Sequence, residues 1–197
     1  MWNRLKPKTC KRLRDSSNSN HTNMLVIPSS RPTLTFLLAA IVAMLIPGPL
    51  RAGTLDDAPF HIVVPDGGWQ VADTAEHAVG KDVSVAATVS NTNGLRSVVI
   101  KAVLQNASDS SLDDLCAGIR DSFANPAVYK ISEGDTKFLG YKAKTFAYQI
   151  SQGDTATYNE ATIFIADGKG WTITSLGPAE KKEEVKKIIK FFKKKER

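Results

Sequence analysis

Hydrophobic and polar positions divide the chain into one nearly continuous apolar run and, after it, alternating and helical patterns. The run covers residues 34–46 and is shorter than the roughly 20 residues that a membrane-spanning helix needs. Arg31 precedes it, and residues 47–49 (Pro-Gly-Pro) and the small residue Ala52 follow it, as in a secretory signal peptide. The pattern therefore predicts a leader over residues 1–52 and a single exported domain over residues 53–197.

The first 23 residues are unusual for such a leader because they are basic, rich in Ser and Asn, and hold one acid, Asp15. Two interpretations stay open. Met24 is the true start, which leaves a leader of ordinary size, or the segment is an organellar transit peptide, which has this Arg- and Ser-rich composition. The first predicts a periplasmic or secreted protein, and the second predicts an organelle lumen.

Beyond residue 53, alternation of apolar and polar positions predicts about six strands separated by turns. The predicted strands cover residues 60–64, 83–90, 96–104, 137–150, 157–166 and 170–176. Residues 91–94 (Asn-Thr-Asn-Gly) tolerate positive φ and predict a hairpin. In strand 137–150, Ala143 and Phe146 belong to apolar sets of opposite parity. This predicts either a bulge near Lys144 and Thr145 or a strand covered on both faces.

Two amphipathic helices complete the pattern. The first begins at Ser110 or Ser111 and carries an apolar stripe at Leu112, Leu115, Cys116, Ile119 and Phe123. The second covers residues 179–194, with Val185, Ile188, Ile189 and Phe192 on one face. It either packs on the sheet by this stripe or presents a basic face to anionic lipid or an acidic partner, and both are compatible. The predicted fold class is α+β, an antiparallel sheet flanked by helices.

This order of elements resembles the PsbP-like superfamily, which includes extrinsic photosystem II proteins, a Ran-binding nuclear import factor and bacterial envelope proteins of the DcrB type. Four segments carry the resemblance: Phe60-x-Ile62-x-Val64-Pro65 before Trp69, Gly140-Tyr141-x-Ala143, Asp167-Gly168-x-Gly170-Trp171-x-Ile173-Thr174, and Ile188-Ile189-x-Phe191-Phe192. The resemblance implies an α/β/α sandwich whose relatives mostly bind or stabilise other proteins. It offers no catalytic residue and no cofactor.

Charge is distributed unevenly along the chain. Residues 1–52 hold eight Lys and Arg against one acid, so the basic character of the whole chain belongs mainly to the leader. Residues 53–180 hold nine basic and 16 acidic residues, whereas residues 181–197 hold nine basic and three acidic ones. An acidic body with a basic end does not indicate a nucleic-acid partner.

Candidate catalytic groups are few. Cys116 falls on the helical stripe, which predicts a buried thiol rather than a nucleophile. His61 alternates with apolar Phe60 and Ile62, so we expect it on the sheet surface, and neither it nor His77 has a partner at metal-ligand spacing. We therefore expect no metal, no cofactor and no catalytic site.

The candidate binding surface consists of Tyr158, Glu160, Lys186, Lys187, Lys193, Lys194 and Lys195. Tyr158 has parity opposite to the apolar positions of its strand, and the lysines belong to the second helix. We expect a non-enzymatic exported module for binding or assembly in the cell envelope, with a protein partner and weak contact with an anionic membrane. The alternative is a small-ligand-binding or hydrolase-like enzyme on the same sheet.

Overall fold

The computed structural model describes residues 55–80, 82–104 and 109–196, with only the backbone for residues 73–80 and 109–111. The predicted leader, including Met24 and the site after Ala52, lies outside these residues and stays a prediction. The side chains of His77 and of the predicted helix caps Ser110 and Ser111 are outside them as well. Within the described residues, no helix is both long and apolar enough to span a bilayer.

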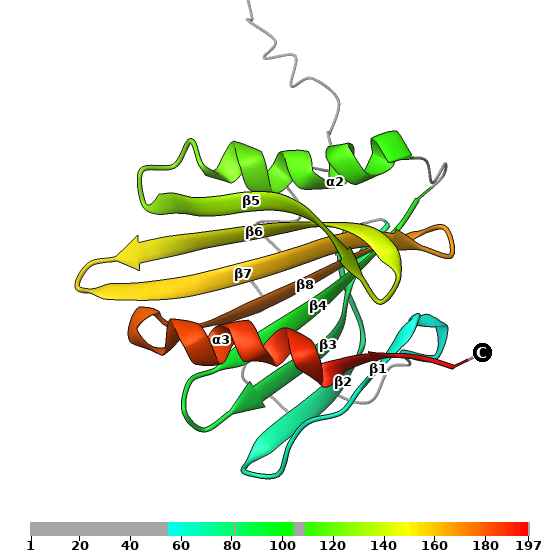
Figure 1. The fold of residues 1–197 in the computed structure, drawn as a ribbon, viewed down its shortest axis with the longest axis horizontal. Coiled ribbons are helices and arrows are strands. Elements are labelled where there is room, and N and C mark those ends of the chain that lie inside the picture. Colours follow the sequence, from blue (N-terminus) through cyan, green and yellow to red (C-terminus); the bar gives the residue numbers. More distant parts are fainter. Residues whose placement is uncertain (1–54, 81, 105–108, 197) are drawn as a thin grey trace, which may run out of the picture. The chain divides into compact units, whose positions relative to one another are not determined.

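A seven-stranded antiparallel sheet forms the centre of the domain, with strand order β2-β3-β4-β8-β7-β6-β5 (Figure 1). Its strands are β2 (Trp69–Gly80), β3 (Val83–Asn91), β4 (Arg96–Val103), β5 (Val128–Phe138), β6 (Tyr141–Gln152), β7 (Thr155–Ala166) and β8 (Lys169–Pro178). A separate ribbon pairs β1 (Phe60–Ile62) with β9 (Phe192–Lys194). The α+β class is confirmed, but the predicted strand 60–64 is outside the main sheet, while β2 and β5 are additional strands.

The sheet is covered on both faces. Helix α2 (Asp109–Ser122) packs on one face with Leu115, Cys116 and Ile119, which join a core that includes Phe146 and Ile163. On the opposite face lie helix α3 (Lys182–Ile188) and the β1–β9 ribbon, whose buried residues contact the sheet through two further apolar clusters. The layers are therefore helix, sheet, helix, as the resemblance implied.

Strand β6 explains the change of parity found in the sequence. Its register with β7 is unbroken from Ala143 to Gln152, so no bulge lies at Lys144 or Thr145. Ala143 contributes to the core on the ribbon side, whereas Phe146 and Tyr148 contribute to the core under α2. The second alternative, a strand covered on both faces, is confirmed.

The predicted strand 137–150 is wrong at its beginning. The chain reverses at Leu139 and Gly140, whose φ angles are +54° and +92°, as in the two-residue type I′ turns that connect hairpins. The strand before the turn, β5, is an edge strand and most of its side chains are exposed, so it shows no apolar alternation. Leucine rarely adopts a positive φ, and for this reason the turn was not expected there.

The C-terminal segment also differs from the prediction of one helix over residues 179–194. It consists of a 3-10 turn (Ala179–Lys181), the short helix α3, a second 3-10 turn (Ile189–Phe191) and strand β9. Phe192 is extended because it pairs with Ile62 of β1 and its ring contacts the ring of Phe60 at 5.5 Å. The domain therefore ends in a strand and not in a basic amphipathic helix, although Val185, Ile188 and Phe192 are buried as expected.

Candidate functional site

Tyr158 and Glu160 do not form an exposed aromatic and acidic surface. Tyr158 is 1% exposed and belongs to the core cluster with Val185 and Ile188 of α3. Its hydroxyl donates to Glu160 Oε2 at 3.1 Å, and the Lys182 ammonium lies 5.3 Å from its ring centre. Burial, followed by the neighbouring Glu160 carboxylate, raises the pKa of Tyr158 above its ordinary value. Tyr158 does lie on the face of β7 opposite to Ala161 and Ile163, as predicted. That face is not exposed at Tyr158, because α3 covers it.

The lysines of α3 and the turn after it point in different directions. Lys186 Nζ forms an ion pair with Glu183 Oε1 at 2.9 Å, and both residues belong to α3. Lys187 and Lys190 are exposed and, among the described residues, form no ion pair. Because Val185 and Ile188 face the sheet, Lys187 and Lys190 lie on the outer side of this segment. They are free to contact an anionic partner.

Lys193 and Lys194 of β9 and Lys195 directly after it have three different environments. Lys193 is exposed and lies opposite His61 in the β1–β9 register. Lys194 lies near the β5–β6 turn, since a Cβ built on Gly140 would be 3.7 Å from its Nζ. Lys195 Nζ donates to the carbonyl oxygens of Leu55 at 2.8 Å and Asp56 at 3.1 Å. The structure therefore separates the lysines that were predicted to act together at a helix end.

A groove of about 620 Å³ lies at the end of the sheet where the β5–β6 and β7–β8 turns meet the C-terminal segment. It is lined by Leu139, Gly140, Tyr141, Asp167, Lys194 and Lys195, together with Glu196. Both amines and carboxylates border this groove, so its chemistry selects no single charge type. A second groove, of about 490 Å³, lies at the opposite end of the sheet and is bordered by Asp154 and Glu180.

An apolar surface follows the side of the C-terminal segment that faces β1 and β2. The rings of Trp69 and Phe191 meet edge to face at 4.9 Å, and both are half-buried. The backbone N–H of Val63 donates to the Phe191 carbonyl at 2.8 Å, which fixes Val63 beside this aromatic pair. Val71 lies two residues after Trp69 on the same face of β2. Val63 and Val71 are 50% and 42% exposed, so we call these four residues the Trp69 patch.

The sequence did not predict a contact between Trp69 and Phe191, which entered only as residues that carry the resemblance. Phe191 was part of the resemblance segment, but no sequence pattern placed it next to Trp69. The available signal was Val63, an apolar residue whose parity is opposite to that of Phe60 and Ile62. Such positions are informative when they gather, although single exposed apolar residues are common.

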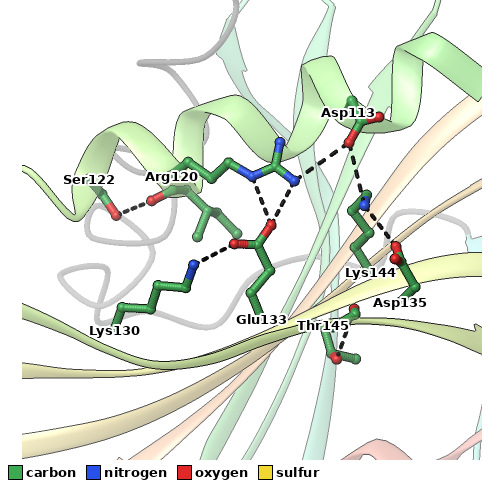
Figure 2. A network of polar contacts seen from close by, with 10 residues as sticks. Asp113, Arg120, Ser122, Lys130, Glu133, Asp135, Lys144 and Thr145 are labelled. Atoms are coloured by element: carbon green, nitrogen blue, oxygen red, sulfur yellow. Dashed lines mark hydrogen bonds and ion pairs between the residues drawn. The ribbon is translucent and has the colours of Figure 1, made fainter.

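A network of ion pairs connects α2 with the edge of the sheet (Figure 2). Its members are Asp113 and Arg120 of α2, Lys130, Glu133 and Asp135 of β5, and Lys144 of β6. Arg120 donates two hydrogen bonds to Glu133 Oε1, at 2.8 and 2.6 Å, and Lys130 donates to Glu133 Oε2 at 2.6 Å. These bonds lower the pKa of Glu133 and raise that of Arg120.

The role of this network is structural, because its three carboxylates pair with its three cationic side chains. Asp113 and Arg120 are seven residues apart and lie on one face of α2, a spacing that would have revealed the helix side of the network. Lys144 connects Asp113 at 3.5 Å with Asp135 at 2.7 Å and so joins helix and edge strand. Each pair alone contributes little at the surface, but together they fix β5 against α2.

The first described residues are held by lysines from three other parts of the chain. Asp57 Oδ2 lies 3.0 Å from Lys169 Nζ and 3.3 Å from Lys101 Nζ, and Lys195 binds the two preceding carbonyls. Partial burial acts to raise the pKa of Asp57, but the hydrogen bonds and charges of Lys169 and Lys101 outweigh it and keep the pKa below its usual value. This contact anchors the beginning of the described domain.

The candidate nucleophile and histidine lie apart from one another. Cys116 is fully buried, and its burial raises the pKa of the thiol to about 12, so the thiol stays protonated at neutral pH. His61 is exposed on β1, as expected, and faces Lys193. Within the described residues, no three His, Cys, Asp or Glu side chains gather as a metal site would require.

No protein-family model matches the sequence, and no curated protein matches it. Among solved structures, the solution structure of cyanobacterial PsbP (CyanoP) from Synechocystis is similar, with 18% identity and a TM-score of 0.53, over 77% of this chain and 95% of that chain. The crystal structure of LpqN, involved in cell envelope biogenesis of Mycobacterium tuberculosis, aligns over 67% of this chain and 78% of that chain, with 10% identity and a TM-score of 0.47. The similarity to CyanoP confirms the PsbP-like fold.

Proposed function

We propose that this chain is a non-enzymatic exported module for binding or assembly in the cell envelope, which recognises an anionic partner through its C-terminal segment. The observation that carries this proposal is the outward position of Lys187, Lys190 and Lys193, without carboxylate partners among the described residues. The rest of the domain is acidic, so these lysines form its one strongly basic segment. A protein with an acidic surface is the partner that the PsbP-like resemblance favours.

The exported location is part of the same proposal and rests on the leader predicted over residues 1–52. Processing after Ala52 would leave Gly53 as the first residue, only two residues before the anchored turn at Leu55. Mass spectrometry of the protein recovered from an exporting host should find an N-terminus near Gly53. An intact segment 34–46 in the membrane fraction would contradict export as a soluble domain.

The partner can be tested by capture from the exported compartment. The wild-type protein and a variant with Lys187→Gln, Lys190→Gln and Lys193→Gln serve as baits, with Lys137→Gln on the exposed edge strand β5 as the control. We expect the triple variant to lose its acidic partner and the control to retain it. The difference should shrink as salt rises, because exposed charges are screened within about 8 Å at 0.15 M ionic strength. Equal capture by all baits at low salt would refute the proposal.

The alternative of a small-ligand site has one observation in its favour, the groove of about 620 Å³ beside Tyr141 and Lys194. Its lining combines Asp167 on the β7–β8 turn with Lys194, Lys195 and Glu196 of the C-terminal segment, so groups of both charges converge on one groove. A thermal-shift screen with zwitterionic metabolites tests it, with Lys194→Gln as the variant. A ligand-induced rise in Tm that is lost in this variant would favour the alternative over the protein-binding module.

A further inference from the structure

We propose that the Trp69 patch and the lysines beside it dock the domain on the surface of an anionic lipid bilayer. The inference rests on the proposed function, because it uses the same C-terminal segment and adds an anionic lipid surface as a second partner beside the acidic protein. It adds a second component, an apolar surface contributed by β2 and the segment after β1. The patch was defined above by Val63, Trp69, Val71 and Phe191.

The apolar component is continuous across three segments distant in sequence. The Val63–Phe191 backbone hydrogen bond and the Trp69–Phe191 ring contact join the loop after β1, the start of β2 and the turn after α3. Trp69 and Phe191 also pack inward against two core clusters, so the patch is supported from below and does not depend on mobile side chains. Trp is enriched at the interface between lipid headgroups and acyl chains. The patch therefore has the composition of a surface that inserts shallowly into a bilayer.

The basic component borders the apolar one. Lys190 directly precedes Phe191, and Lys187 lies one helical turn before it. Lys193 lies on the outer face of the β1–β9 ribbon, opposite His61 and on the same side as Val63. Four exposed carboxylates belong to the same segments: Asp66, Glu183, Glu184 and Glu196. Glu183 is paired with Lys186, and the lysines of residues 181–196 outnumber these carboxylates, so the balance of described charges is moderately positive.

The composition of this surface also suits an anionic lipid. Protein interfaces favour Arg and are depleted in Lys, and eight of the nine basic residues in 181–197 are lysines, with Arg197 the exception. The lysine ammonium is a strongly hydrated point charge and lacks the planar, bidentate geometry of the arginine guanidinium. It therefore suits lipid headgroup phosphates, whose orientation is not fixed. Exposed valines beside Trp and Lys complete the pattern of an interfacial binding surface.

Vesicle sedimentation tests the proposal with the processed protein recovered from exporting cells, its N-terminus determined first. The vesicles contain either phosphatidylcholine alone or phosphatidylcholine with 30% phosphatidylglycerol. We expect binding to the anionic vesicles only. Neutralising Lys187, Lys190 and Lys193 together should weaken it by roughly fivefold per lysine at low salt, with less effect at high salt.

A second pair of variants isolates the apolar component. Val63→Ser combined with Val71→Ser should weaken binding several-fold at both low and high salt, because burial of apolar area is not screened. Both valines are exposed, so the fold should persist, and Val103→Ser at the 54% exposed end of β4 is the matched control. Unchanged binding of the double-valine variant would overturn the assignment of this surface.

The outcomes also separate this inference from the proposed function. If the anionic vesicles fail to bind but the lysine variant still loses an acidic protein in the capture experiment, the lipid inference is wrong and the proposed function stands. If the lysine variant changes neither vesicle binding nor protein capture, both are wrong. Vesicle binding that depends on the lysines and on the valines supports the lipid inference. If protein capture is unchanged in the same lysine variant, the acidic-protein partner of the proposed function is wrong.

Discussion

Leu115 of α2 packs directly on the backbone of Gly170 in β8. A Cβ built on Gly170 would lie 2.7 Å from Leu115 Cδ1, closer than real Cβ atoms approach, and 3.3 Å from Leu115 Cδ2, which is a tight contact. The absence of a side chain at residue 170 therefore sets the distance between α2 and the sheet. It also explains why glycine occupies a buried position inside a strand.

Gly170→Ala should consequently destabilise the domain by about 1–3 kcal/mol, because the new methyl group forces Leu115 and the helix outward. Urea denaturation followed by circular dichroism measures this change. Gly134→Ala is the matched control, since it also replaces a strand glycine but its Cβ would meet only Thr145 Oγ1, at 3.9 Å. Equal stabilities of the two variants would show that α2 does not depend on close approach at Gly170.

Phe192→Ala should cost on the order of 3 kcal/mol, the lower part of the range for truncation of a buried aromatic ring. The ring is 2% exposed and packs on Phe60 in the ribbon, so its removal leaves a cavity between ribbon and sheet. Lys193→Gln, the next residue, should remain within about 0.5 kcal/mol of wild type. The free energy of unfolding of both variants tests whether the ribbon is packed as described.

Cys116 should resist thiol reagents in the native protein and react after unfolding. It is fully buried, and its raised pKa leaves little thiolate at neutral pH. A Cys10→Ser background removes the other cysteine of the chain, so that the label counts Cys116 alone. Labelling within seconds without denaturant would contradict the burial and reopen the possibility of a nucleophile.

Asp57→Asn should lower stability at pH 7 by less than about 1 kcal/mol, since the carboxylate is partly exposed and solvent screens it. The folded-state pKa of Asp57 is lowered, so its contribution is present above the unfolded-state pKa and is lost as pH falls through the folded-state pKa. The stability difference between wild type and variant should therefore shrink as pH falls below about 4. Denaturation at several pH values checks this, and a difference that grows on acidification would exclude the lysine contacts as its source.

The sequence was sufficient where apolar alternation coincided with burial. The alternation in β7 correctly placed Tyr158 on the face opposite to Ala161 and Ile163. The apolar stripe of α2 correctly predicted that Cys116 is buried. The hairpin at residues 91–94 was also predicted, and the structure shows why: Asn91 Oδ1 accepts the N–H groups of Asn93 and Leu95 at 3.0 and 3.1 Å. In each case the information is local.

The failures were non-local. Residue 192 continues a helical pattern, yet it pairs with Ile62, which lies almost the whole domain away in sequence. Edge strand β5 shows no apolar alternation because most of its side chains are exposed on both faces of the sheet. The candidate surface failed in the same way: α3 covers Tyr158, and the partners of Lys195 are carbonyls near the beginning of the domain. Contacts of this kind leave no periodic signal in either segment.

The β1–β9 ribbon also sets the order in which the domain can be completed. Strand β1 is the first strand of the described residues and its partner β9 is the last, so Phe60 has no strand beside it until residues 192–194 are available. All neighbouring strands of the main sheet except β4 and β8 are consecutive in the chain and can pair earlier. We therefore expect the sheet to assemble first and the ribbon to close over Trp171 and Phe164 as the last step of folding. If residues 192–194 could not pair with β1, the ribbon would not form and the rings of Trp171 and Phe164 would be exposed to solvent.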